Sequence, residues 1–275
     1  MNKLKKIFSS LKPHLTAKNL KIVLILFFLV VGIFYWFGRK TRESIKEHRF
    51  LVATDSRWSQ LDLRGQERYM QGFISELLDA IGNEENIHLR LVPVASSELL
   101  DQLDKGYYDG VVTSLSSDIL SGDKYIFSDP FYLTGPVLIV PVHSKAKSIS
   151  DLDTIGVKTG FFTAFSIVGE PLVSIIYYEN MNEALSQLLS GKIDGLIMNS
   201  LDAYAYIQGY YAGKLKVATP PLNKSGLRLA SLHTFFGKHL VEIFDEGVQK
   251  LKEEKIYDQL LNKWELVNPE TAYTK

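Results

Sequence analysis

Short polar side chains follow two apolar segments of this chain that have similar sequences. Thr113 and Ser114, with Ser116 close behind, follow the first segment, and Asn199 follows the second. Hydroxyl and carboxamide groups beside free backbone groups suit a small polar ligand, although serines are also ordinary turn residues. Ligands of open α/β sheets bind beyond the carboxyl ends of the strands, so these residues could face one another across a cleft.

The two segments belong to an internal repeat with an offset of 85 residues. The sequence QLDKGYYDGVV of residues 102–112 corresponds to QLLSGKIDGLI of residues 187–197. In each copy a helix with leucines on one face stops at a glycine, which can take the left-handed C′ conformation. An Asp-Gly pair then turns the chain into a short apolar strand. Two copies of this unit predict two similar α/β lobes rather than one sheet.

Charge is divided unevenly along the 275 residues. Residues 1–49 hold 11 Lys/Arg and 2 Asp/Glu, a net charge of +9, whereas the other 226 residues hold 20 and 29, a net charge of −9. With 46% hydrophobic and 12% aromatic residues, the chain can form one or two ordinary cores. An acidic globular part is poorly suited to nucleic acid, whose phosphates need a basic face, so no nucleic-acid partner is expected.

An uncharged run of 17 residues, 22–38, lies within the basic head. At about 1.5 Å per residue it reaches roughly 25 Å, enough to cross a bilayer core if the flanking basic side chains extend to the interface. It ends in bulky residues such as Tyr35 and Trp36 rather than in the small residues of a cleavage site, and the chain has no cysteine to carry a lipid. We therefore predict an uncleaved transmembrane signal anchor at 22–38, between a basic cytoplasmic tail, 1–21, and a linker, 39–48. A buried core helix is the alternative, which the basic flanks disfavour.

Hydrophobic patterns in the rest of the chain predict alternating strands and helices. A helix is expected at 69–81, ended by Gly82-Asn83, and a long helical stretch at 239–264. Strands are expected at 50–53, 88–94, 137–142, 155–157, 216–218 and 227–231, in addition to the two in the repeat. Alternation with few hairpin signals predicts mostly parallel sheets flanked by helices.

From residue 50 to about residue 266, the chain resembles the extracellular (periplasmic) solute-binding proteins of family 3, the polar-amino-acid type. The resemblance rests on segments that occur in order and at the spacing of that family: GFISEL at 72–77, the turns at 106–109 and 191–194, FSDPFY at 127–132, and KW at 263–264. It implies the two-lobed α/β fold of the type II periplasmic binding proteins. Lobe 1 would comprise 49–139 plus 223–275 and lobe 2 would comprise 140–222, with two crossing strands near 140–142 and 219–222 as the hinge.

The resemblance also implies a function. Members of the family capture a small polar solute, such as an amino acid or a derivative, by closing two lobes, and usually pass it to the permease of an ABC importer. The protein would then be a single-pass protein of the bacterial inner membrane, with its globular domain in the periplasm or otherwise outside the cytoplasm. No P-loop, G-x-S-x-G, H-E-x-x-H or paired Cys/His spacing occurs, so no catalytic residue, cofactor or metal is expected. Two alternatives stay open: an orphan sensor or interaction module that has lost the amino-acid site, and a dehydratase-like enzyme on the same fold.

Three positions depart from the pattern of the family. Its carboxylate-binding Arg falls at Ser121, its ammonium-binding Asp at Asn199, and a site Thr at Asp118. Loss of one partner of a desolvated charge pair costs roughly 2–5 kcal/mol. Either Arg57 or Lys124 substitutes for the missing cation, or the ligand is not a standard free α-amino acid. Asp118 would meet a ligand ammonium from the opposite lobe or serve as a helix cap.

The resemblance places three further residues against the ligand. Asp55 and Trp58 follow the first strand, where Trp58 would offer a flat apolar surface for stacking or would close the core of the lobe. Thr163 leads into a helix whose N-terminal amides suit an anion. The neighbouring Phe161-Phe162 make this place more apolar than in the family, unless the two rings belong to the core.

Overall fold

The computed structural model describes residues 26–33, 35, 49–56, 66–115, 123–159 and 173–273. The chain divides into two compact units, Met1–His48 and Arg49–Lys275. In the first unit, residues 26–33 and 35 are helical and their side chains are exposed. Within the described ranges, no helix is both long enough and apolar enough to cross a membrane.

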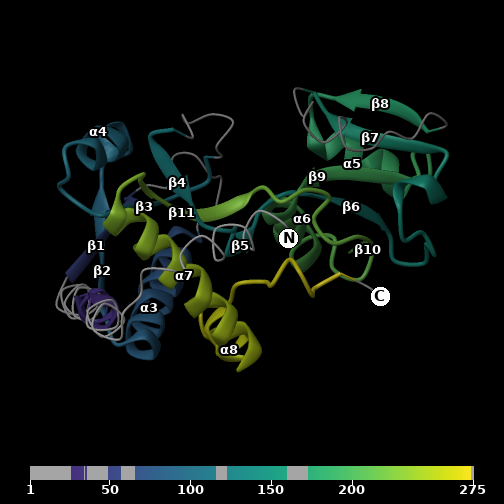
Figure 1. Ribbon diagram of the computed structural model, residues 1–275. Helices are drawn as coiled ribbons and strands as arrows, with labels where there is room; N and C mark the ends of the chain where they lie inside the picture. Colours follow the sequence, from purple (N-terminus) through teal and green to yellow (C-terminus); the bar gives the residue numbers. More distant parts are fainter. Residues whose placement is uncertain are drawn as a thin grey trace, which may run out of the picture. The chain divides into compact units, whose positions relative to one another are not determined.

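The second unit contains two sheets, which Figure 1 shows as separate groups of strands. In the part of the chain that the structure describes, the first sheet has six strands in the order β2-β1-β3-β11-β4, and β5 also pairs with β11. These strands are β1 (Arg49–Asp55), β2 (His88–Val94), β3 (Gly110–Thr113), β4 (Tyr125–Phe127), β5 (Tyr132–Leu133) and β11 (Gly226–Leu232). The first lobe therefore contains a sheet formed by strands from both the N-terminal part and the C-terminal part of this unit.

The second sheet has five described strands in the order β10-β6-β9-β7-β8. They are β6 (Pro136–Pro141), β7 (Thr154–Lys158), β8 (Ser174–Tyr178), β9 (Gly195–Asn199) and β10 (Leu215–Val217). Residues 136–139, which the sequence prediction assigned to lobe 1, pair with β9 and β10 in this second sheet. The chain thus enters the second sheet a few residues earlier than the expected boundary at 139–140.

Both sheets are mixed, but in each sheet all the described strands except one run in the same direction, so the prediction of mostly parallel sheets is confirmed. The pairs β1–β2, β1–β3, β7–β8 and β7–β9 are parallel. In contrast, β6 and β11 run antiparallel to each of their described partners. These two exceptions have a topological reason, because β6 and β11 bring the chain into each sheet from the other lobe and enter from the opposite direction.

The described helices of the second unit are α3 (Glu67–Glu85), α4 (Leu99–Asp104), α5 (Met181–Leu189), α6 (Ser200–Gln208), α7 (Phe235–Glu253) and α8 (Ile256–Lys263), with 3₁₀ turns η1 (Ser96–Glu98) and η2 (Ile149–Asp151). Two predicted boundaries are wrong. Helix α3 continues through Gly82 and ends at Asn86, which takes the left-handed conformation with φ 53°. The predicted stretch at 239–264 is two helices, because Lys255 adopts φ 62° and separates α7 from α8.

The helix ends of the internal repeat are the same in both copies. Gly106 and Gly191 have φ of 73° and 72°. The amide after each glycine donates to the carbonyl five residues back, Tyr107 to Gln102 at 3.1 Å and Lys192 to Gln187 at 3.0 Å. This is the Schellman motif, which satisfies the last carbonyls of a helix and favours glycine at C′. The prediction of a repeated helix-to-strand unit is confirmed.

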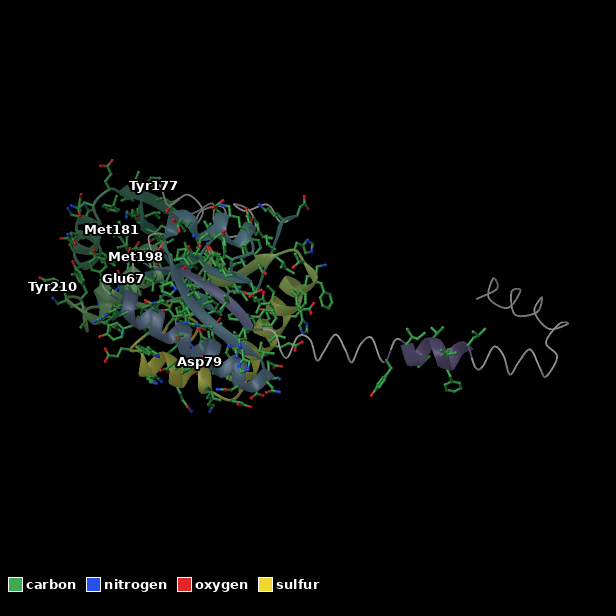
Figure 2. The ribbon with its side chains drawn as sticks, turned by 90° about the vertical axis from the view of Figure 1, so that its left-hand side faces the viewer. Glu67, Asp79, Tyr177, Met181, Met198 and Tyr210 are labelled. Atoms are coloured by element: carbon green, nitrogen blue, oxygen red, sulfur yellow. The ribbon has the colours of Figure 1, made fainter. Side chains whose placement is uncertain are left out.

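Each sheet is held by buried apolar side chains. Helices α3 and α7 pack against each other beside the first sheet (Figure 1), and a Cβ atom on Gly72 of α3 would overlap the indole ring of Trp264. Lys263 forms an ion pair of 2.6 Å with Glu76 one turn further along α3. In the second sheet, Met198 of β9 is buried in a core cluster and Met181 of α5 packs against it (Figure 2). The segments 72–77 and 263–264 of the sequence therefore meet in one contact.

Candidate functional site

The parallel strands β1 and β3 end beside each other at one edge of the first sheet. Their register pairs Ala53 with Val111 and Thr54 with Val112, so the next step places Asp55 beside Thr113. Asp55 is 5% exposed and Thr113 is 3% exposed. Because the carboxyl ends of parallel strands are where open α/β sheets bind ligands, this edge is the candidate site of the first lobe.

Asp55 and Thr113 both interact with other groups of the folded chain. Asp55 has interaction partners in the folded chain, as a buried carboxylate requires. Thr113 Oγ1 accepts a hydrogen bond from the Leu115 amide at 3.1 Å and so shapes the turn after β3. Ser114 lies between Thr113 and Leu115 in that turn and is half-buried, so a ligand can partly reach it.

Asn199 stands at the carboxyl end of β9, the strand of the second sheet that corresponds to β3. It is the N-cap of α6, and its Oδ1 accepts a hydrogen bond from the Leu201 amide at 2.9 Å. The capping bond uses the carbonyl half of the carboxamide. The Nδ2 half donates no hydrogen bond to any described residue. The group that Asn199 can offer to a ligand is therefore a donor, which suits an acceptor rather than an ammonium.

Buried hydroxyl groups accompany these strand ends. Within the described residues, Thr54 Oγ1, Ser200 Oγ and the Tyr204 hydroxyl are buried without a hydrogen-bond partner. Burial raises the pKa of Tyr204 to about 12, so its phenol stays protonated at neutral pH. Ser200 donates its amide to the Gly135 carbonyl at 3.2 Å and thereby joins the start of α6 to the segment before β6. Unsatisfied hydroxyls of this kind are available to a polar ligand or to water.

The remaining predicted site residues lie outside the described part of the chain: Trp58, Ser116, Asp118, Ser121 and Thr163. Arg57, one of the two cations considered as substitutes, also lies outside it. The other, Lys124, forms an ion pair of 2.5 Å with Asp104 and is 51% exposed, so its charge is already matched. The structure places Asp55 and Ser114 at the edge of the first sheet and Asn199 at the corresponding edge of the second.

Sequence reasoning missed Arg228. This residue lies on β11 directly opposite Thr113 in the antiparallel register, and so at the same edge of the first sheet. It is half-buried between the fully buried Leu227 and Leu229. A single arginine inside the apolar strand GLRLASL was the signal that could have drawn attention to it, because a cation on such a strand needs a specific reason.

Two hollows of the surface lie elsewhere. One of about 750 Å³ is lined by Gln66, Gln208, Asp258, Asn262 and residues of the last segment, and one of about 220 Å³ lies around Asp245. None of the predicted site residues lines either hollow. In the part of the chain that the structure describes, no three His, Cys, Asp or Glu side chains are grouped so that they could hold a metal ion.

Comparison with protein families decides the relationship. The model of the bacterial extracellular solute-binding proteins, family 3, matches residues 50–267. The chain belongs to this family. The match spans both sheets and the helices that cover them, and it confirms the resemblance inferred from the sequence.

Known members and neighbours of family 3 share limited identity with this chain. The probable histidine-binding protein of Neisseria gonorrhoeae is 21% identical over 78% of this chain and 82% of its own length. The ABC transporter glutamine-binding protein GlnH of Bacillus subtilis is 23% identical over 68% of this chain and 67% of its own length. A crystal structure of an ancestral cyclohexadienyl dehydratase, AncCDT-3(P188L), superposes with a TM-score of 0.60 at 19% identity, covering 81% of this chain and 94% of that one. At such identity the structural likeness shows the fold alone.

Proposed function

We propose that this family 3 protein captures a small polar solute, an amino acid or a derivative of one, between its two lobes. The observation that carries the proposal is the placement of Thr113 and Asn199 at the carboxyl ends of the corresponding strands β3 and β9, with Asp55 at the carboxyl end of β1 beside Thr113. Members named for histidine and glutamine binding give the solute class. Lobe closure would surround the solute with side chains from both edges and exclude water from it.

The same proposal extends to residues outside the described ranges. We propose that Trp58, Ser116, Asp118, Ser121 and Thr163 complete the site together with Asp55, Ser114 and Asn199. Replacement of Trp58 by Ala should abolish solute binding while the melting temperature stays nearly unchanged. A large loss of stability with binding retained would instead place Trp58 in the lobe core.

The partner and the location follow from the family. An extracellular solute-binding domain belongs in the periplasm or at the outer face of the cell membrane, where the permease of an ABC importer would receive the solute. We propose further that residues 22–38 tether it to that membrane as an uncleaved anchor. The mass of the protein isolated from membranes should then correspond to a chain that begins at or near Met1. A chain that begins after residue 38 would contradict the tether.

The proposed binding function is tested by a thermal-shift screen of the full chain against the twenty amino acids, short peptides, organic acids and polyamines. A ligand at about 100 Kd stabilises the folded state by roughly 2.7 kcal/mol, which raises the melting temperature measurably. A rise with at least one amino acid or derivative is expected. No rise with any compound would favour an orphan module. That second function draws support from Asn199, whose carbonyl oxygen is already used by the helix cap.

An enzymatic function is the third possibility, which the sequence left open and for which the likeness to the ancestral dehydratase is a further reason. At 19% identity this likeness extends to the fold and not to a reaction. Each compound that binds is incubated with the protein, and chromatography then shows whether it has been converted. Conversion would indicate an enzyme, and recovery of the unchanged compound would indicate a receptor.

A further inference from the structure

Arg228 occupies a place in the first sheet where an arginine is costly. The residues on either side of it, Leu227 and Leu229, are fully buried, and β11 lies inside the sheet between β3 and β4. Lys and Arg are almost never fully buried unless their charge is paired, and Arg228 is half-buried with its Nε enclosed. The position therefore requires a reason beyond packing.

The sheet register shows where the side chain of Arg228 is placed. Ala53, Val111 and Ala230 stand side by side on three neighbouring strands and belong to one buried cluster. Side chains on a strand alternate between faces, so residues two positions away share the face. Asp55, Thr113 and Arg228 are each two positions from that row, all toward the carboxyl edge of β1 and β3. These three residues form a polar row on the same face, at the candidate site.

The guanidinium of Arg228 is only partly satisfied. Its Nη2 donates a hydrogen bond to the Lys224 carbonyl at 3.0 Å. Lys224 precedes the first residue of β11, so this bond directs the guanidinium toward the beginning of that strand. Its Nε is buried and has no hydrogen-bond partner among the residues that the structure describes. Among the described residues, no carboxylate forms an ion pair with it. A buried guanidinium donor without an acceptor is unfavourable, and a planar fork of donors matches a carboxylate in two parallel hydrogen bonds.

We propose that Arg228 binds an anionic group of the solute, and that this group is a carboxylate. The inference rests on the proposed binding function and names the residue that would read the charge of the ligand. The cation comes from β11, in the C-terminal part of the chain, rather than from the loop that contains Ser121. Asn199 supports the same assignment from the second lobe, because its Nδ2 is a donor and would meet an acceptor. A free amino acid then remains a suitable solute.

The test is calorimetric titration of the full chain with three amino acids and their counterparts that lack the carboxylate. The pairs are L-histidine and histamine, L-glutamine and 4-aminobutanamide, and L-arginine and agmatine. The variants are Arg228→Ala and Arg228→Lys, with Arg90→Ala as a matched control, since Arg90 is exposed on β2 of the same sheet. Circular-dichroism melts verify that each variant is folded. Arg228→Lys keeps the charge in case the alanine variant unfolds.

For an amino acid that the wild type binds, Arg228→Ala should weaken binding by about 30-fold or more. Arg228→Lys should weaken it less, and Arg90→Ala should change it by less than about twofold. Binding of the counterpart without the carboxylate should be nearly the same in all variants. Equal affinity of wild type and Arg228→Ala for the amino acid would overturn the inference and leave the proposed function intact. Equal weakening of both members of a pair would overturn it as well. If the wild type binds none of the six probes, the amino acid with the largest thermal shift and its decarboxylated counterpart take their place. If no amino acid binds at all, the proposed amino-acid function is overturned, and with it this inference.

Discussion

Asp109 and Asp194 form the same pair of hydrogen bonds, the first with β1 and the second with β7. The Asp109 carboxylate accepts a hydrogen bond from the Leu51 amide at 2.8 Å, and the Asp109 amide donates to the Leu51 carbonyl at 2.8 Å. The Asp194 carboxylate and amide make the same two bonds to Thr154, at 2.9 Å and 2.8 Å. The Asp-Gly pair of the repeat is therefore more than a turn signal, because its side chain ties the turn to the adjacent parallel strand.

Removal of these carboxylates should destabilise the chain unequally. Asp109→Ala deletes an acceptor for a part-buried amide and should cost about 1–3 kcal/mol, whereas Asp194→Ala acts at an exposed pair and should cost less than about 1 kcal/mol. Urea unfolding of each variant measures the difference. Asp109→Asn, which keeps an acceptor oxygen, serves as the control. An equal effect of the two alanine variants would show that burial does not decide the strength of this bond.

The contact between Gly72 and Trp264 predicts an unusual sign for a helix substitution. A glycine-to-alanine change inside an exposed helix normally stabilises by about 1 kcal/mol. Gly72→Ala should instead destabilise by about 1–3 kcal/mol, since the new methyl group overlaps the indole ring. Thermal unfolding of the single variant, of Trp264→Ala and of the double variant forms a cycle. Stabilisation by Gly72→Ala in the Trp264→Ala background is expected, and destabilisation there would exclude the ring as the cause.

Local patterns predicted most elements of the fold, but they failed where tertiary contacts decide. The repeat predicted two lobes because its glycine and Asp-Gly positions encode a complete helix end and turn. The end of α3 was misplaced because Gly82 remains helical while Asn86 takes the left-handed conformation. The two antiparallel strands were not predicted, because no local signal states that β6 and β11 arrive from the other lobe. These errors concern connections rather than elements.

Asp245 should make stability depend on pH. Burial raises the pKa of Asp245 to about 6, an effect that the Asp129 carboxylate increases and the hydrogen bond from the Asp129 amide opposes. The folded protein therefore binds more protons than the unfolded chain between about pH 4 and pH 6. The contribution of this group to stability falls as the pH rises through that window, by an amount that partial solvent exposure reduces.

Asp245→Asn should thus be more stable than the wild type above pH 6 and should lose that advantage near pH 4. The asparagine keeps an oxygen that can accept the Asp129 amide. Denaturant unfolding from pH 4 to pH 7.5, with the exposed Asp153→Asn as control, measures the effect. A constant difference between Asp245→Asn and wild type over this range would refute the raised pKa.

Asn199 offers a substitution that separates capping from binding. Asn and Asp cap helices about equally well, so Asn199→Asp should change stability by less than about 0.5 kcal/mol. Aspartate lacks the Nδ2 donor that we propose to face the solute carboxylate and adds a negative charge beside it, so binding of an amino acid should weaken by about tenfold or more. Titration calorimetry with the best amino acid from the thermal-shift screen measures this change. Unchanged affinity in a stable Asn199→Asp variant would remove Asn199 from the site.

Sequence reasoning reached part of the candidate site for a clear reason. Asp55, Ser114 and Asn199 follow strands that the repeat and the hydrophobic pattern already defined, so their place at the strand ends could be predicted. Arg228 follows its sheet partners in the chain, and it faces Thr113 across an antiparallel pair more than a hundred residues apart in sequence. Such long-range pairing leaves no local pattern.

Lobe closure around a solute is the central claim, and the absence of cysteine from the chain makes it directly measurable. Lys105 and Lys192 are exposed, and each lies next to the glycine that ends a helix of the repeat, one in each lobe. Both lysines are replaced by cysteine and spin-labelled. Pulsed electron paramagnetic resonance then measures the distance between the two labels, one in each lobe. Saturation with an amino acid that binds should shift the distance distribution to a narrower, displaced peak. An unchanged distribution at saturation, with binding verified by calorimetry on the same labelled sample, would contradict capture by lobe closure.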